Sequence, residues 1–282
     1  MRRAMLAAAT SGVLLLSGVS ATAHASPQPA APPSPTSTAL LSTAETGCTE
    51  IAYWRGGLAS AVRPLVPPRY ELAPFPAPDG FPARVALVIN ELSCRTTVNT
   101  RPGRRDEQRD VTTIIISVNT TSIDGQPSDG YYNLLYATEN RTQQRTLNRL
   151  GWPADLLKRR SGIDVSTSPG GLTQAALSVR GSGWGHDVSG ATIFPLNQAT
   201  RGQVAFRRDT PQGQLQLCVD TLEASAPGAV TGDLTGTPFA TITAAPPTYA
   251  GFSGTAPFTT TLIRGDQQST LTDETCPAPT TR

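Results

Sequence analysis

The sequence predicts a β-rich α+β domain, in which a curved antiparallel sheet closes into a barrel and carries one main helix. Two observations predict this fold class. Between residues 47 and 276 the chain consists mostly of short runs rich in β-branched and aromatic residues, separated by Gly and Pro, which is typical of sheets and barrels. Only the segment 141–150 reads as a substantial helix, because capping side chains precede it and Gly151 and Pro153 follow it. We therefore expect a single folded domain over residues 47–276.

The first 25 residues have the features of a secretory signal peptide. Arg2 and Arg3 precede the apolar run 5–19, and residues 23–25, Ala-His-Ala, form a small-residue cleavage site. The apolar run is shorter than the roughly 20 residues that a membrane-spanning helix needs. We therefore expect a secreted, extracellular protein with no membrane span after removal of residues 1–25.

Residues 26–46 are rich in Pro, Ser, Ala and Thr, a composition that cannot bury enough apolar surface to offset the entropy of ordering. They are interpreted as a disordered linker, and residues 277–282 as a tail. Removal of the signal peptide leaves 21 basic and 21 acidic residues. A neutral chain with no basic run is a poor binder of nucleic acid, so no nucleic-acid partner is expected.

Four cysteines remain in the exported chain: Cys48, Cys94, Cys218 and Cys276. An even number of cysteines in an oxidising compartment predicts two disulfides. Three pairings are possible, and we favour Cys48 with Cys94, which ties the N-terminal segment to the first strand, and Cys218 with Cys276. The chain has no CxxC pair, and spacings this wide suit no common metal site, so no metal is expected.

The strand pattern continues along the whole domain. The segments 84–92, 111–119 and 131–136 are expected to be buried strands, and Ser168-Pro-Gly-Gly predicts a hairpin between 162–165 and 172–179. Further short strands are expected at 191–194, 203–207, 215–220, 240–243 and 259–263. A short helix is expected within 51–66, and the glycine-rich segment 181–190 is expected to be a flexible loop.

The stretch 129–155 resembles the acetoacetate decarboxylase family. Tyr136 stands where the family has an aromatic residue at a strand end, Thr-Glu-Asn at 138–140 stands for the helix cap, and Trp-Pro at 152–153 for an aromatic–Pro turn. The resemblance extends over about 66–179. It implies a barrel that encloses one small, mostly apolar molecule, with a pocket lined by Tyr132, Tyr136, Trp152 and Ala154.

The chain departs from this family where the family's chemistry resides. In the family the two residues after that Pro are lysines, and one of them forms a Schiff base with a β-keto acid. Here these positions are Ala154 and Asp155, and a methyl group cannot attack a carbonyl. The family strand that supplies a glutamate corresponds to 111–119, where Thr112 and Thr113 lie near that position. The resemblance therefore implies the fold without decarboxylase activity.

Three residues are candidate catalytic groups, each with a simpler alternative. Asp155 would be an acid or base in an apolar cavity, or it points outward and caps the next segment. Lys158 is the only lysine of the chain, and adjacent arginines would favour its uncharged, nucleophilic form, or it lies in a solvated basic turn. His186 is the only histidine after the signal peptide; it would be a general base oriented by Asp187, or it is an exposed loop residue.

The sequence leaves three functional hypotheses. The favoured one is a secreted protein that binds a small hydrophobic or keto-containing molecule. The second is a cofactor-independent isomerase, cyclase or lyase that uses Asp155, Tyr136 and Tyr132; no glycine-rich phosphate loop follows a strand, so no cofactor is expected. The third is a non-catalytic extracellular interaction domain whose barrel is filled by side chains. A raised carboxylate pKa in the cavity would favour the second hypothesis.

Overall fold

The structure, a computed structural model, describes residues 39–76, 80, 82–101, 104–158, 162–192, 197–236, 260–273 and 276. The predicted signal peptide, most of the predicted linker, the strand expected at 240–243 and the tail lie outside the described residues. No helix in the described part is long and apolar enough to cross a membrane.

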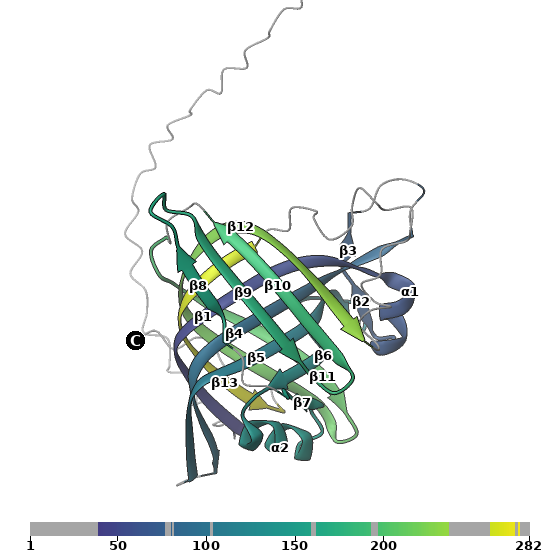
Figure 1. Cartoon of the computed structure of the whole chain (residues 1–282). Coiled ribbons are helices and arrows are strands. Elements are labelled where there is room, and N and C mark those ends of the chain that lie inside the picture. The colour runs from purple at the N-terminus through teal and green to yellow at the C-terminus, as the bar shows by residue number, and fades with distance from the viewer. Residues whose placement is uncertain are drawn as a thin grey trace, which may run out of the picture. The chain divides into compact units, whose positions relative to one another are not determined.

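The described elements are mostly strands (Figure 1). In chain order they are β1 (Leu41–Leu58), α1 (Ala59–Val62), the 3-10 helix η1 (Arg63–Leu65), β2 (Tyr70–Leu72), β3 (Pro74–Phe75), β4 (Arg84–Arg101), β5 (Arg104–Ile123), β6 (Gln126–Thr138), α2 (Arg141–Arg149), β7 (Ala154–Leu156), β8 (Asp164–Thr167), β9 (Thr173–Arg180), β10 (Trp184–Thr192), β11 (Thr200–Thr210), β12 (Gly213–Gly236) and β13 (Thr260–Thr272).

Seven strands close into a barrel in the order β1-β4-β5-β6-β11-β12-β13, with β13 pairing back to β1. All of these pairings are antiparallel except that of β6 with β11. The predicted β-rich barrel with one main helix is therefore confirmed, with one parallel pair in an otherwise antiparallel barrel. Both disulfides are present in the favoured pairing, Cys48 with Cys94 and Cys218 with Cys276.

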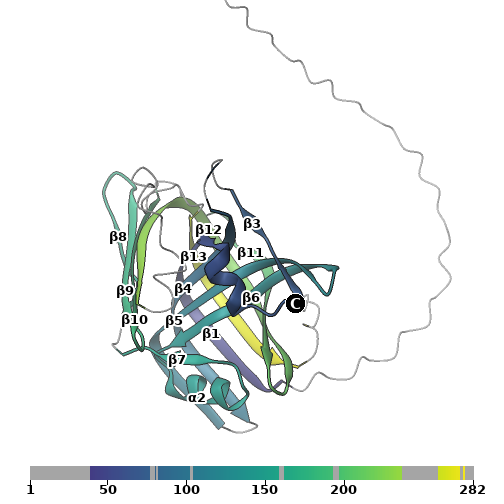
Figure 2. The ribbon, with the colours of Figure 1, turned by 90° about the vertical axis from the view of Figure 1, so that its right-hand side faces the viewer.

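A second layer lies on the outside of this barrel. The distal half of β12 pairs with β10, which continues to β9 and β8. Figure 1 shows these three strands crossing in front of β1, β4 and β5, and Figure 2 shows them as a separate layer beside the barrel. We call β8, β9 and β10 the outer layer.

Two apolar clusters follow from this arrangement. The interior cluster takes residues from all seven barrel strands and from α2, so it lies inside the barrel: Leu41, Val98, Ile115, Tyr136, Leu147, Trp152, Ala154, Phe206, Leu215, Leu217, Val219 and Leu271. The interlayer cluster takes residues from β1, β4, β5 and β6 together with β9, β10 and the α1–β2 segment, and includes Tyr53, Ile89, Ile114, Tyr132, Leu177, Val179, Trp184 and Val188.

The N-terminal boundary of the folded domain is earlier than the sequence predicts. β1 begins at Leu41, inside the predicted linker 26–46, and Leu41, Thr43 and Glu45 alternate into the barrel. The segment is held by pairing with β4 and with β13, more than 200 residues away in the chain, and local composition carries no sign of such partners. For the same reason the helix expected within 51–66 is wrong over its first half, because β1 continues to Leu58 and only 59–65 is helical.

Candidate functional site inside the barrel

A β-bulge in β6 decides which of its aromatic residues face the barrel interior. The pairing of β6 with β5 shifts at Leu134, which is left without a partner. An extra residue reverses the alternation of side chains beyond it. Tyr132 therefore belongs to the interlayer cluster and Tyr136 to the interior cluster. Of the four predicted pocket residues, the structure brings Tyr136, Trp152 and Ala154 together and places Tyr132 on the opposite face.

Helix α2 fixes the Tyr136 hydroxyl. Asn140 caps the helix, since its side chain accepts a hydrogen bond of 2.9 Å from the backbone of Gln143. The Gln143 side chain turns inward, where its amide donates to the Tyr136 hydroxyl at 2.8 Å and its oxygen accepts from the Thr138 hydroxyl at 2.9 Å. Thr113 in turn donates to Thr138 at 3.3 Å. All of these side chains are buried, so the phenol is held in one position.

Strand β7 places residue 154 beside Tyr136. The two residues pair in the parallel β6–β7 ladder, and Asn148 of α2 receives the Ala154 N–H at 2.7 Å and donates to its carbonyl at 2.9 Å. The position at which the resembled family has its nucleophilic lysine thus faces the interior cluster. It carries a methyl group, so Ala154 can contribute contact with a ligand but no amine.

Glu45 is an acidic group of the interior, and sequence analysis missed it. Its side chain is almost fully buried, and no described residue donates a hydrogen bond to its carboxyl group. Burial raises the pKa of Glu45 to about 7, because a low-dielectric surrounding disfavours the charged form. Burial also raises the pKa of Tyr136 well above its ordinary value, and the nearby Glu45 charge adds to this effect.

Other polar groups of the interior also have no hydrogen-bond partner. Thr96, which lies directly opposite Glu45 in the β1–β4 pairing, has an unpartnered hydroxyl, and Trp152 has an unpartnered indole N–H. Glu50, on the same face of β1, is different, because it accepts hydrogen bonds from Asn90 at 2.6 Å and from Gln267 at 2.8 Å. The interior therefore includes an acid, a hydroxyl group and an N–H that the described protein groups leave unsatisfied.

A second buried network joins the outer layer to the barrel. The Tyr53 hydroxyl of β1 lies 2.8 Å from Nε2 of His186 on β10, and Glu91 of β4 forms an ion pair with Nδ1 of the same ring. Glu91 and His186 are both fully buried. The segment 181–190 was expected to be a flexible loop with an exposed histidine; instead its second half is part of β10. Its glycines allow close approach, since a Cβ at Gly185 would lie 2.8 Å from the Arg180 side chain.

The group that orients His186 is Glu91 and not Asp187. Successive residues of a strand face opposite sides, so Asp187 points away from the interlayer cluster, where it pairs with Arg180 at 2.9 Å and accepts from Ser178. The hydrogen bonds from Arg180 and Ser178 lower the pKa of Asp187. A glutamate in the mostly apolar strand 84–92 was the available signal for Glu91.

The other two predicted catalytic residues lie outside the interior cluster. Asp155 accepts hydrogen bonds from the Trp184 indole at 2.7 Å and from the Ser182 backbone at 3.0 Å, so it caps the turn between β9 and β10. Lys158 is exposed, and its backbone N–H donates to the Arg180 carbonyl.

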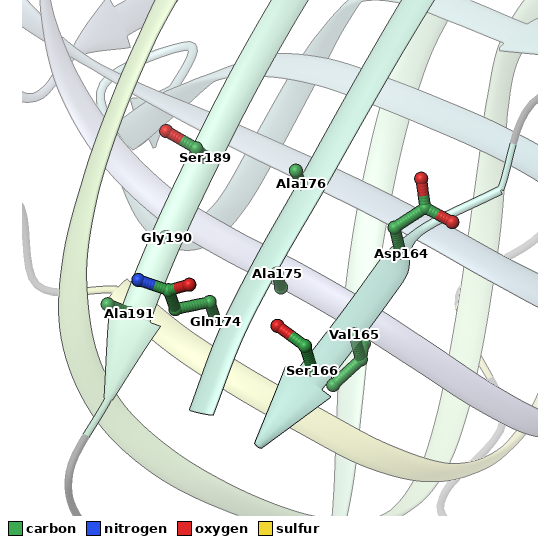
Figure 3. Close-up of a pocket in the computed structure, with 9 residues that line it drawn as sticks. All are labelled: Asp164, Val165, Ser166, Gln174, Ala175, Ala176, Ser189, Gly190 and Ala191. Atoms are coloured by element: carbon green, nitrogen blue, oxygen red, sulfur yellow. The ribbon is translucent and has the colours of Figure 1, made fainter. Parts of the chain in front are cut away.

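A hollow of about 580 Å³ lies on the outer layer (Figure 3). It is lined by three consecutive residues from each strand: 164–166 of β8, 174–176 of β9 and 189–191 of β10. These residues pair with one another across the layer. Most are small, Asp164 is the one charged side chain among them, and none of the predicted pocket residues belongs to the lining.

Metal binding finds no support in the described part of the chain, where no group of three or more His, Cys, Asp and Glu residues is arranged to hold an ion. Thr96 and Trp152 are among the buried groups of the described residues that have no hydrogen-bond partner.

Neither a protein-family model nor a curated protein matches the sequence. Among solved structures, the chain is similar to the enduracididine biosynthesis enzyme MppR complexed with pyruvate, at 14% identity and a TM-score of 0.46 over 84% of this chain and 91% of that one. It is also similar to acetoacetate decarboxylase from Legionella pneumophila, at 11% identity and a TM-score of 0.43 over 86% and 91%. The stretch 129–155 resembles the family to which this second protein's name refers.

Proposed function

We propose that this chain is an exported barrel protein that binds a small, mostly apolar molecule carrying a keto group, inside the barrel and without Schiff-base chemistry. The observation that carries the proposal is the buried Glu45 carboxyl, which faces the interior cluster and has no hydrogen-bond partner among the described residues. Buried polar groups in folded proteins are nearly always hydrogen-bonded, and an unsatisfied one costs about 1–3 kcal/mol.

A keto group matches the unsatisfied groups of the interior. Below pH 7 Glu45 is mostly protonated, because its pKa is about 7, and a protonated carboxyl group donates a hydrogen bond. The Trp152 indole N–H is a second donor, and the Thr96 hydroxyl can donate or accept. A carbonyl oxygen would accept from one or two of them, while the apolar part of the ligand would contact Leu, Val and Phe side chains of the interior cluster.

The absence of an amine supports binding without decarboxylation. Ala154 occupies the interior position that would have to carry the nucleophile, and Lys158 is exposed at the end of the β7 turn. The predicted signal peptide and the two disulfides support export, because disulfides persist in oxidising compartments. Detection of the disulfide-bonded chain, cleaved near residue 25, in the culture medium tests this part of the proposal.

The experiment that tests ligand binding is native mass spectrometry of the mature protein with 2-heptanone as the probe. We expect one bound molecule per chain. The variant Glu45→Leu is similar in volume and removes the carboxyl group, so it should weaken binding by about tenfold or more, which corresponds to the loss of one hydrogen bond to a ligand. Circular dichroism and the urea midpoint confirm that the variant is folded.

The matched control is Ala176→Trp, which fills the hollow on the outer layer and leaves the barrel unchanged. Binding inside the barrel predicts unaltered affinity for this variant. Loss of binding in Ala176→Trp together with full binding in Glu45→Leu would place the ligand in the outer hollow and contradict the proposal.

A second candidate function is acid–base catalysis at the same site, and the pKa of Glu45 favours it. A general base works best when its pKa is close to the working pH, and Glu45 has a pKa of about 7. Its carboxylate would take a proton from the carbon next to the keto group, while Trp152 or Thr96 donates a hydrogen bond to the enolate oxygen. Return of the proton to the same carbon regenerates the ketone, and with a β,γ-unsaturated ketone its return to the γ-carbon gives the conjugated isomer. Proton NMR in D₂O tests this, since catalysis would exchange the α-protons of 2-heptanone for deuterium, and Glu45→Gln would abolish the exchange.

A further inference from the structure

Two β-bulges flank the same short piece of β4 on the outer surface of the barrel. The pairing of β1 with β4 shifts between Thr46 and Thr49, and the pairing of β4 with β5 shifts between Cys94 and Thr96, where Arg109 and Asp110 of β5 face a single residue, Arg95. Bulges occur preferentially next to functional sites, where they redirect side chains. Here two of them converge on one segment.

The backbone at both bulges is in the left-handed region. Gly47 has φ of 60° and Asp110 has φ of 53°. Glycine adopts this conformation freely, but for other residues it is uncommon and costs free energy. Asp124, the other described non-glycine residue with positive φ, precedes Gly125 in a tight turn. Asp110 lies inside a long strand, where the bulge accounts for its positive φ, and residues of this kind cluster at ligand sites.

The bulges enclose a hollow of about 390 Å³, which we call the bulge site. Its lining includes two arginines, Arg95 and Arg109, together with Thr46, Ser93 and Asp110. The disulfide between Cys48 and Cys94 cross-links the two strands behind it. This cross-link between β1 and β4 restricts the movement of the lining residues, and preorganisation of this kind lowers the entropic cost of binding.

The charges of the bulge site favour an anion. Arg95 and Arg109 are exposed, and no described carboxylate forms an ion pair with either of them. By contrast, Arg105, on the same strand as Arg109, forms an ion pair with Glu107 at 3.2 Å. Asp110 is the one acid in the lining, and Asp266 at the margin is engaged by the Gly47 N–H at 2.9 Å. Arg95 and Arg109 both line this hollow, and arginine side chains are the usual recognition elements for carboxylate and phosphate oxygens.

We propose that the bulge site binds a small oxyanion, a carboxylate- or phosphate-bearing molecule, between Arg95 and Arg109, with the Ser93 and Thr46 hydroxyl groups as additional donors. The site lies on the opposite face of β4 from the interior cluster, because Arg95 lies between Cys94 and Thr96, which both face inward. It is therefore independent of the ligand proposed inside the barrel. Either function can fail without the other.

Isothermal titration calorimetry of the mature protein at low ionic strength tests the proposal, with inorganic phosphate and succinate as separate probes. At least one probe should bind at millimolar concentration with one site per chain. Arg95→Gln and Arg109→Gln should each weaken binding by about tenfold, since each removes one charge-assisted contact. The probe that binds more tightly distinguishes phosphate-bearing from carboxylate-bearing ligands.

Two further variants separate a specific site from general surface charge. Arg105→Gln removes a charge from the same strand outside the bulge site and should leave the affinity unchanged. Asp110→Asn keeps a residue type that tolerates positive φ but removes the opposing charge, so it should strengthen binding. No binding of either probe, or equal weakening in Arg105→Gln and in the two lining variants, would overturn the proposal.

Discussion

The Tyr53 hydroxyl lies 2.8 Å from Nε2 of His186, and Glu91 holds the other nitrogen of the same imidazole ring. The three residues come from β1, β10 and β4, so this one network connects the outer layer to the barrel. It lies within the interlayer cluster, where Trp184 and Val188 flank His186 on the same face of β10. Breaking it leaves a polar or charged group buried without a partner.

Replacement of Glu91 by Ala is expected to lower the free energy of unfolding by about 3–5 kcal/mol, the usual cost of removing one partner of a buried ionic pair. Asp187→Ala is the control, since it removes an exposed ion pair on the other face of β10 and should cost no more than about 1 kcal/mol. Urea denaturation with both disulfides intact measures the two values. If both variants lost about the same small amount of unfolding free energy, Glu91 would not stabilise the contact between the outer layer and the barrel.

Stability should depend on pH through Glu45, in a direction opposite to that of a salt-bridged acid. Glu45 ionises near pH 4.5 in the unfolded chain and near pH 7 in the folded protein. Between these values unfolding releases a proton, so the free energy of unfolding falls as pH rises, by about 3 kcal/mol in total. The contribution is complete below pH 4.5 and lost once the pH passes about 7.

Glu45→Gln should remove this component. The stability of the variant relative to the natural chain is expected to increase by about 3 kcal/mol from pH 4.5 to pH 8, as measured by urea denaturation at several pH values. Glu107→Gln, at an exposed position of β5, should give parallel curves. A Glu45→Gln curve that parallels the natural one would mean that Glu45 is ionised normally in the fold.

Removal of the disulfide between Cys48 and Cys94 should destabilise the protein by about 2–5 kcal/mol, because the bond restricts the unfolded chain and native disulfides of exported domains have values in this range. The double variant Cys48→Ala/Cys94→Ala is compared with Cys218→Ala/Cys276→Ala. The two bonds close loops of 46 and 58 residues, so loop entropy alone predicts similar losses. The first variant should additionally reduce anion binding at the bulge site, and a binding constant unchanged by it would show that the cross-link is not needed there.

The chain should not form a Schiff base. Incubation with acetoacetate and sodium borohydride is expected to leave the mass of the mature protein unchanged, because the interior position 154 carries a methyl group and Lys158 is an exposed amine. A reduced adduct that disappears in Lys158→Met would restore Lys158 as a nucleophile and contradict the account of the site.

The barrel, the main helix and the disulfides could be predicted because they depend on local signals. The cap at Asn140, the stop at Gly151 and the runs of β-branched residues each act within a few positions of themselves. The start of β1 at Leu41 could not be predicted in this way, since its partners are at residues 92–99 and 265–271.

The site residues were harder to predict than the fold. Tyr136, Trp152 and Ala154 were predicted from the resemblance over 129–155. The bulge at Leu134, which places Tyr132 on the other face of β6, cannot be recognised from the run of aromatic and aliphatic residues in the sequence. Glu45 lay in a segment of low-complexity composition, and His186 in a glycine-rich segment that is typical of a loop. Both are buried by contacts distant in the chain, which no local pattern records.

Native mass spectrometry of the mature protein from culture medium, followed by the Glu45→Leu variant, tests the central claim most directly. A ligand bound inside the barrel predicts a discrete added mass that is released on denaturation, strongly reduced in Glu45→Leu and retained in Ala176→Trp. A natural chain that carries no added mass, and that does not bind 2-heptanone at millimolar concentration, would contradict the claim and favour an interaction domain whose barrel is filled by its own side chains.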